Sequence, residues 1–162
     1  MHNESNQYEL NRILQDFQKG LVKESIIKIK DYIKRFPKDL TAKYNYAIIL
    51  EKKNKKIEAS TLYKHILKKK PNHWQSLTNL YLFYFNDSNY LDALPLVEKI
   101  IELKPNYQPA LRDHAHILYR LNKLDIALKK ILLSVKLNPK DHIALNVMGM
   151  IYSGLKNTKT SK

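Results

Sequence analysis

Four prolines recur at one fixed spacing, and this periodicity constrains the fold more than any other feature of the sequence. They stand 34 residues apart, at Pro37, Pro71, Pro105 and Pro139. Each proline follows one amphipathic stretch and precedes another. Proline ends a helix because it lacks an N–H donor and clashes with the preceding turn. A repeat of this length indicates an array of similar helical units.

The proline spacing divides the chain into repeats when each proline is set at place 32 of 34. The predicted repeats are 6–39, 40–73, 74–107 and 108–141, followed by a terminal helix at 142–154 and a disordered tail at 156–162. Small residues then share columns. Place 20 holds Ser25, Ala59, Ala93 and Ala127, and place 8 holds Ala47, Ala115 and Gly149. Small side chains at these places allow two antiparallel helices to approach closely.

The sequence resembles the tetratricopeptide repeat (TPR) family, most clearly in the stretch from Pro139 to Tyr152. The resemblance covers almost the whole chain, although the tryptophan that the family carries at place 4 is absent. It implies an all-α fold, a right-handed superhelical solenoid of antiparallel helix pairs, as a single array over residues 1–162. We expect nine helices, at about 7–19, 23–35, 41–53, 56–69, 75–86, 91–103, 109–121, 125–137 and 142–154. Pro95 should delay or kink its helix.

The resemblance also implies a concave groove lined by the first helix of each repeat. Place 6 of that helix faces the groove in the family, and here it holds Asn11, Asn45, Asn79 and Asp113. Asparagine costs roughly half a kcal/mol relative to alanine inside a helix. An amide offers a donor and an acceptor, so such a column would hold an extended peptide by its backbone. The alternative is a solvated polar column from an AT-rich, asparagine-rich genome.

Other groove places carry aromatic and basic side chains. Aromatic residues and arginine dominate binding hot spots, whereas an aromatic stripe at helical spacing is also typical of a core. The predicted peptide-binding residues, besides the place-6 column, are Tyr44, Phe85, Arg112, His116 and Tyr119. The sequence thus predicts a non-catalytic protein-interaction scaffold that binds an extended peptide segment. The alternatives are an accessory module serving a sulfotransferase-like or glycosyltransferase-like partner, and a basic surface that binds nucleic acid.

The charge argues against the nucleic-acid alternative. The formal net charge is +14, but 25 of the 29 basic residues are lysine and only 4 are arginine. Base readout and bidentate phosphate contacts depend mainly on arginine. We therefore expect a protein or peptide partner in the groove rather than nucleic acid.

No pattern of residues indicates catalysis, a cofactor or a metal. The chain has no cysteine, and His114 and His116 lie two residues apart, on opposite sides of a helix. No apolar stretch approaches the ~18–20 residues of a membrane span. The N-terminus is polar, without the features of a signal peptide. We expect no enzyme activity, no cofactor and a cytoplasmic location.

The terminal helix has no partner helix in the predicted array. Its apolar residues Met148, Tyr152 and Leu155 would have packed on that partner. Exposed apolar patches often mark contact surfaces. We expect possible self-association through these residues.

Overall fold

The computed structural model describes residues 2–160, with side chains from residue 4 to residue 157. Nine α-helices and no strand lie in this range. They are α1 His2–Gln18, α2 Val22–Arg35, α3 Leu40–Lys52, α4 Lys56–Lys69, α5 Trp74–Asn86, α6 Tyr90–Leu103, α7 Gln108–Arg120, α8 Leu124–Leu137 and α9 His142–Thr160. The helices from α2 to α8 begin and end within about one residue of the positions that the 34-residue repeat predicts.

The two terminal helices are longer than the sequence predicts. α1 begins at His2 rather than near residue 7, and α9 runs to Thr160 rather than ending at 154. Residues 156–160 are therefore helical and not a disordered tail, while 161–162 lie outside the described residues. Gly154, the predicted last residue of this helix, lies inside α9, and a Cβ there would lie 3.3 Å from a Leu124 methyl. This glycine serves close packing inside the helix rather than its end.

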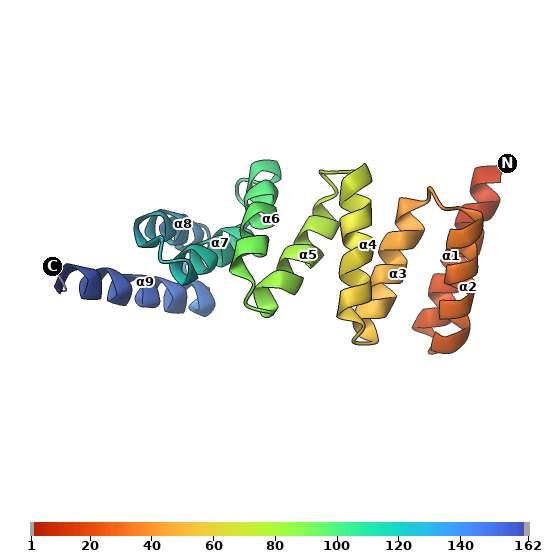
Figure 1. The fold of residues 1–162 in the computed structure, drawn as a ribbon, viewed down its shortest axis with the longest axis horizontal. Coiled ribbons are helices and arrows are strands. Elements are labelled where there is room, and N and C mark those ends of the chain that lie inside the picture. The colour runs from red at the N-terminus through yellow and green to blue at the C-terminus, as the bar shows by residue number, and fades with distance from the viewer. Residues whose placement is uncertain (1, 161–162) are drawn as a thin grey trace. The chain divides into compact units, whose positions relative to one another are not determined.

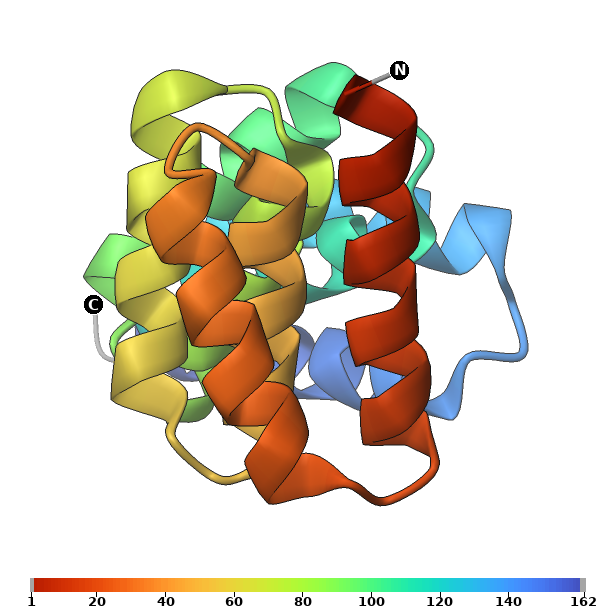
Figure 2. The same ribbon diagram turned by 90° about the vertical axis from the view of Figure 1, so that its right-hand side faces the viewer.

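The chain forms two compact bodies, one up to Pro71 and one from Asn72. The N-terminal body holds α1 to α4 and the C-terminal body holds α5 to α9. Within each body, successive helices lie side by side and reverse direction at every turn (Figure 1). Figure 2 shows this for α1 and α2, which are antiparallel and joined by one short turn.

The turn within each helix pair repeats the same backbone conformation. Gly20, Asn54, Ser88 and Asn122 have φ values of 91°, 59°, 58° and 57° and stand 34 residues apart. The residue after each turn donates its N–H back into the first helix, as from Lys55 to the Leu50 carbonyl at 2.8 Å. A residue in the left-handed region ends a helix this way and satisfies its last carbonyls. This turn fixes where the second helix of each pair starts.

The place-20 column lies at the centre of the packing between helices. Ser25, Ala59, Ala93 and Ala127 are all at most 1% exposed. At place 8, Ala47 and Ala115 are both 0% exposed, and the larger Ile13 and Tyr81 are also buried. Gly149 is an exception, because it is exposed and a Cβ there would touch nothing within 4 Å. The small residues predicted to allow close helix approach are therefore in the core except for Gly149.

Pro95 does not delay its helix, contrary to the prediction. α6 begins at Tyr90, capped by Asn89, whose side chain accepts a hydrogen bond from the Asp92 N–H. The helix continues through Pro95 to Leu103. The proline leaves the Leu91 carbonyl without its donor one turn earlier. Leu91 is exposed, so water reaches that carbonyl and the helix tolerates the loss.

None of the described helices is long and apolar enough to cross a membrane.

Replacing Ala127 with leucine tests the close helix approach. Ala127 is 0% exposed, so the added atoms have no room, and we expect a loss of about 1–3 kcal/mol in the free energy of unfolding. Urea unfolding followed by circular dichroism measures it. The matched control is Lys129→Leu, an exposed position in the same helix, where we expect less than about 0.5 kcal/mol of change. Equal stability of Ala127→Leu and the native chain would contradict this packing.

Candidate peptide-binding faces

The place-6 asparagines of the N-terminal body lie on the helix faces that do not form the core. Asn11 is exposed, and its side-chain oxygen accepts a hydrogen bond from Gln7, one turn earlier in α1, at 3.1 Å. Asn45 is half-buried, and its amide donates to the Thr41 carbonyl of α3 at 3.0 Å. Both bonds stay within one helix, so each amide keeps further hydrogen-bonding capacity.

Tyr44 and Asn79 are also half-buried on first helices. The Tyr44 ring lies 6.0 Å from the Tyr63 ring of α4, tilted by 49°. Tyr44 therefore packs partly on its own repeat, which fits the core alternative for the aromatic residues as well as the binding one.

Aromatic and basic side chains gather on one face of the C-terminal body. The Phe85 ring lies 5.3 Å from the His116 ring, nearly edge-on, and 6.0 Å from the Tyr90 ring. The Arg120 guanidinium lies over Tyr90, 4.8 Å from the ring centre. We call these four residues the aromatic cluster. Burial, and then the charge of Arg120, lower the pKa of His116.

Asp113 is not presented to a ligand as the sequence predicts. It is only 7% exposed, because its two carboxylate oxygens are used inside the C-terminal body. The Tyr81 hydroxyl donates to Oδ2 at 3.0 Å and Arg112 Nε donates to Oδ1 at 2.8 Å. Burial and the Asp113 charge raise the pKa of Tyr81. Asp113 thus holds Tyr81 and Arg112 in place, whereas the asparagines at place 6 of the other repeats are more exposed.

Arg112 joins Asp113 to the turn before α9. Its Nη1 donates to Asp141 Oδ2 at 3.2 Å, and Gln108 donates to the same oxygen at 2.8 Å. Asp141 Oδ1 accepts from the backbone N–H groups of Ile143 and Ala144 and so caps α9. Burial raises the pKa of Asp141, but the bonds from Gln108, Ala144 and Arg112 outweigh it and lower the pKa to about 2.

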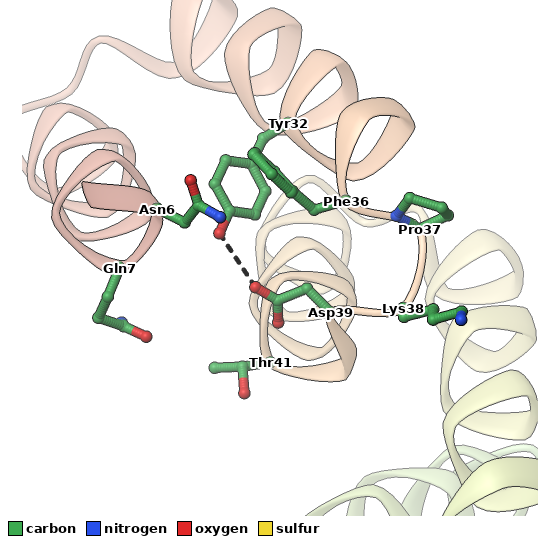
Figure 3. Close-up of a pocket in the computed structure, with 8 residues that line it drawn as sticks. All are labelled: Asn6, Gln7, Tyr32, Phe36, Pro37, Lys38, Asp39 and Thr41. Carbon is green, nitrogen blue, oxygen red and sulfur yellow. Dashed lines mark hydrogen bonds between the residues drawn. The ribbon is translucent and has the colours of Figure 1, made fainter. Parts of the chain in front are cut away.

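A pocket opens in the N-terminal body beside the equivalent turn before α3 (Figure 3). Its volume is about 570 Å³. The residues that line it include Asn6, Gln7, Tyr32, Phe36, Asp39 and Thr41. Gln7 and Thr41 both stand at place 2, which faces the groove in the TPR family. The pocket therefore lies where the first helices α1 and α3 meet the C-terminal end of α2 and the turn that follows it.

Tyr32 and Asp39 form the polar wall of this pocket. The Tyr32 hydroxyl donates to Asp39 Oδ2 at 3.1 Å, as Figure 3 shows. Burial and the bond to Asp39 raise the pKa of Tyr32 to about 12. Asp39 Oδ1 accepts from the Ala42 N–H at 2.9 Å and caps α3. The sequence reasoning missed this pocket, although the aspartates that recur at place 34 were a usable signal.

Tyr119 lies half-buried at the edge of the C-terminal core. It borders a shallow pocket of about 330 Å³ together with Arg120, Asn122, Leu124 and Gly154. Met148 and Leu155 pack partly on the same core, while Tyr152 is 50% exposed. Of the residues predicted to self-associate, Tyr152 is the most open to contact.

His114 is buried among core residues, as its repeat position predicts. It is 3% exposed, and burial followed by the charge of Lys130 lowers its pKa to about 4. Neither ring nitrogen has a hydrogen-bond partner, and Nε2 lies 3.5 Å from a Glu98 oxygen. Among the described side chains, no three His, Asp or Glu gather where they would hold a metal ion.

The Asp141 cap predicts a defined pH dependence of stability. Its pKa is lower in the folded chain than the ordinary 3.8, so its contribution is complete above pH 5 and falls as the pH drops towards 2. The full contribution is about 2 kcal/mol, and about half should be lost by pH 3. We expect the stability gap between the native chain and Asp141→Asn, measured by urea unfolding, to narrow by about 1 kcal/mol from pH 5 to pH 3.

Asp125→Asn is the matched control, because it removes one carboxylate from an exposed position in the first turn of α8. A gap for Asp141→Asn that is unchanged between pH 5 and pH 3 would show that Gln108 and Arg112 do not hold its charge.

Comparison with known proteins finds similarity in fold. No protein-family profile and no curated protein sequence matches the chain. Solved structures of MamA match with a TM-score of 0.82. One, MamA AMB-1, is 16% identical over 98% of this chain and 86% of its own. Another, MamA 41-end from Desulfovibrio magneticus RS-1, is 19% identical over 96% of this chain and 88% of its own.

A third solved structure is YrrB, described as a TPR protein with an unusual peptide-binding site. It matches with a TM-score of 0.82 at 17% identity, over 92% of this chain and 77% of its own. Its helices therefore superpose on those of this chain, although few residues are shared. The all-α solenoid of antiparallel helix pairs that the 34-residue repeat predicts is confirmed, and the chain has the fold of the tetratricopeptide repeat proteins.

Proposed function

We propose that the chain is a non-catalytic scaffold that binds extended peptide segments on its first-helix faces. The observation that carries the proposal is the open pocket at the junction of α1, the end of α2 and the start of α3, whose lining residues Gln7 and Thr41 stand on first helices. Backbone groups of a peptide pair with amide side chains, and its side chains enter pockets and contact aromatic rings.

The two bodies offer different kinds of contact. The N-terminal body presents Asn11 and Asn45, which are hydrogen-bonded one turn back to Gln7 and Thr41 of the pocket lining. The C-terminal body presents Asn79 and the aromatic cluster of Phe85, Tyr90, His116 and Arg120. In this proposal Asp113 positions Arg112, while Arg112, His116 and Tyr119 border the ligand. YrrB, which has the same fold, is described as a peptide-binding TPR protein, and this supports the proposal.

Self-association through Tyr152 and service to a transferase partner stay predictions. Tyr152 is half-exposed on α9, whereas Met148 and Leu155 are partly covered by their own body. The hydrogen bonds of Asp113 and Asp141 connect helices and cap α9, so a structural role explains both carboxylates.

The test is a triple substitution of Asn11, Asn45 and Asn79 with alanine. Peptides that bind the native chain are first selected from a random display library, and their affinities are then measured by calorimetry. We expect the triple variant to bind at least about tenfold more weakly, because each lost amide removes up to two hydrogen bonds. Alanine favours the helix by roughly half a kcal/mol per site, so the variant should unfold at equal or higher urea.

The control variant replaces Asn72 and Asn106 with alanine, two exposed asparagines in turns between helices. It should bind the selected peptides as the native chain does. Native affinity of the triple variant would contradict the proposal, and so would the absence of any selected peptide.

A further inference from the structure

Two places in the chain are equivalent by repeat position but differ in what occupies them. Asp39 and Asp141 are separated by 102 residues, which is three repeats, and each caps the first helix that follows it through its Oδ1. The Oδ2 of each carboxylate points away from the helix that it caps, towards the preceding helix pair. What meets that oxygen is different in the two bodies.

In the C-terminal body the space beside the carboxylate is filled by the chain itself. Asp141 Oδ2 accepts from Gln108 Nε2 at 2.8 Å and from Arg112 Nη1 at 3.2 Å. Gln108 also donates to Ser134 at 2.8 Å. The site is well protected, since the Arg112 and Asp141 side chains are 19% and 9% exposed. A carboxylate at place 34 is thus satisfied by an amide and a guanidinium.

In the N-terminal body the corresponding donors are missing. Asn6 stands at the position of Gln108, one methylene shorter, and Leu10 stands at the position of Arg112. Leu10 is 0% exposed in the core and has no polar group. Among the described residues, Tyr32 alone donates a side-chain bond to Asp39 Oδ2, at 3.1 Å. Within the described part of the chain no arginine reaches Asp39, and a pocket of about 570 Å³ opens beside this carboxylate (Figure 3).

We propose that this pocket binds the guanidinium group of an arginine side chain from the partner. The inference rests on the proposed function, because the arginine belongs to the bound peptide. It adds which side chain of that peptide enters the pocket. The ligand arginine takes the place at Asp39 that Arg112 takes at Asp141. Arg112 in the C-terminal body thus shows which kind of group we expect the pocket of the N-terminal body to bind.

The walls of the pocket suit a planar, delocalised cation. The half-buried Phe36 ring forms the aromatic side, and the buried Tyr32 ring supports it from behind, with the two ring centres 4.7 Å apart. Guanidinium groups stack on aromatic rings and bond carboxylates in a fixed fork, which an ammonium group cannot do. Arg35 already shows this stacking from outside, with its guanidinium 5.2 Å from the Phe36 ring centre. Thr41 supplies a further hydroxyl acceptor at the mouth.

The positive charge of the chain limits which residues can flank the arginine in the ligand peptide. Lys38 lines the rim of the pocket, and the chain has a formal net charge of +14. A strongly basic peptide is repelled before it reaches Asp39. The fitting ligand is therefore a single arginine within an otherwise neutral or acidic segment.

The test uses two small probes of the same shape with the intact chain. Acetyl-arginine-methylamide carries the guanidinium, and acetyl-citrulline-methylamide replaces it with a neutral urea. Each is titrated into 15N-labelled protein, and backbone shifts around residues 32–42 are followed. We expect the arginine probe to bind at least about fivefold more tightly than the citrulline probe. Equal binding of the two probes would overturn the assignment without any variant being made.

Two matched variants test whether the carboxylate of Asp39 is the group that binds the arginine probe. Asp39→Asn keeps the helix cap, because asparagine caps as well as aspartate, but removes the charge from the pocket. We expect it to bind the arginine probe about tenfold more weakly. Asp141→Asn makes the same change where Gln108 and Arg112 already occupy the space, and we expect native probe affinity. A native affinity in Asp39→Asn, or an equal loss in both variants, would overturn the assignment.

The library selection separates this inference from the proposed function. Arginine enrichment among selected peptides, lost when Asp39→Asn is the bait, supports both. Arginine-probe binding at Asp39 without any selected peptide supports the pocket and overturns peptide binding. Selected peptides that depend on Asn45 but carry no enriched arginine, with equal probe affinities, support peptide binding and overturn the pocket assignment.

Discussion

The close approach of antiparallel helices at small buried side chains is the constraint on which the rest of this structure depends. Ser25, Ala59, Ala93 and Ala127 occupy one place in four consecutive repeats, and each is at most 1% exposed. These residues lie on the second helix of each pair, and the first helix packs against them with one face while its other face stays away from the core. The left-handed residue at each turn fixes the start of that second helix. Packing and turn together leave the first-helix faces open.

The aspartate at place 34 couples helix capping to the chemistry of those faces. One carboxylate oxygen holds the start of a first helix, and the other points to the preceding pair. In the C-terminal body Gln108 and Arg112 satisfy that second oxygen, and Arg112 also holds Asp113. In the N-terminal body the same architecture leaves an open pocket.

Most of the fold could be predicted from the sequence because its determinants are local and repeated. The prolines, the place-20 residues and the polar turns each lie within one repeat, so their spacing defines helices α2 to α8. The predicted end of α9 at residue 154 and the predicted delay of α6 at Pro95 were wrong for the opposite reason. The role of Gly154 depends on Leu124, thirty residues earlier, and Pro95 is tolerated because its turn of the helix faces solvent.

The candidate site was less predictable than the fold, since its residues are paired across repeats. Asp113 shares the column of Asn11, Asn45 and Asn79, but Tyr81 and Arg112 cover it. Residue spacing shows which helix face a side chain occupies, not which distant partner satisfies it. The pocket at Asp39 needed the same knowledge, because its lining combines residues of α1, the end of α2 and the start of α3.

The central claim is that ligands contact the first helices and not the second ones. Isotope-filtered nuclear Overhauser measurements on the complex with a selected peptide test it directly. The account predicts contacts from the peptide to side-chain amide protons of Asn45 or Asn79 and to the rings of Tyr44 or Phe85, all on first helices. Contacts only to exposed second-helix residues, such as Ile27 of α2 or Leu132 of α8, would contradict it.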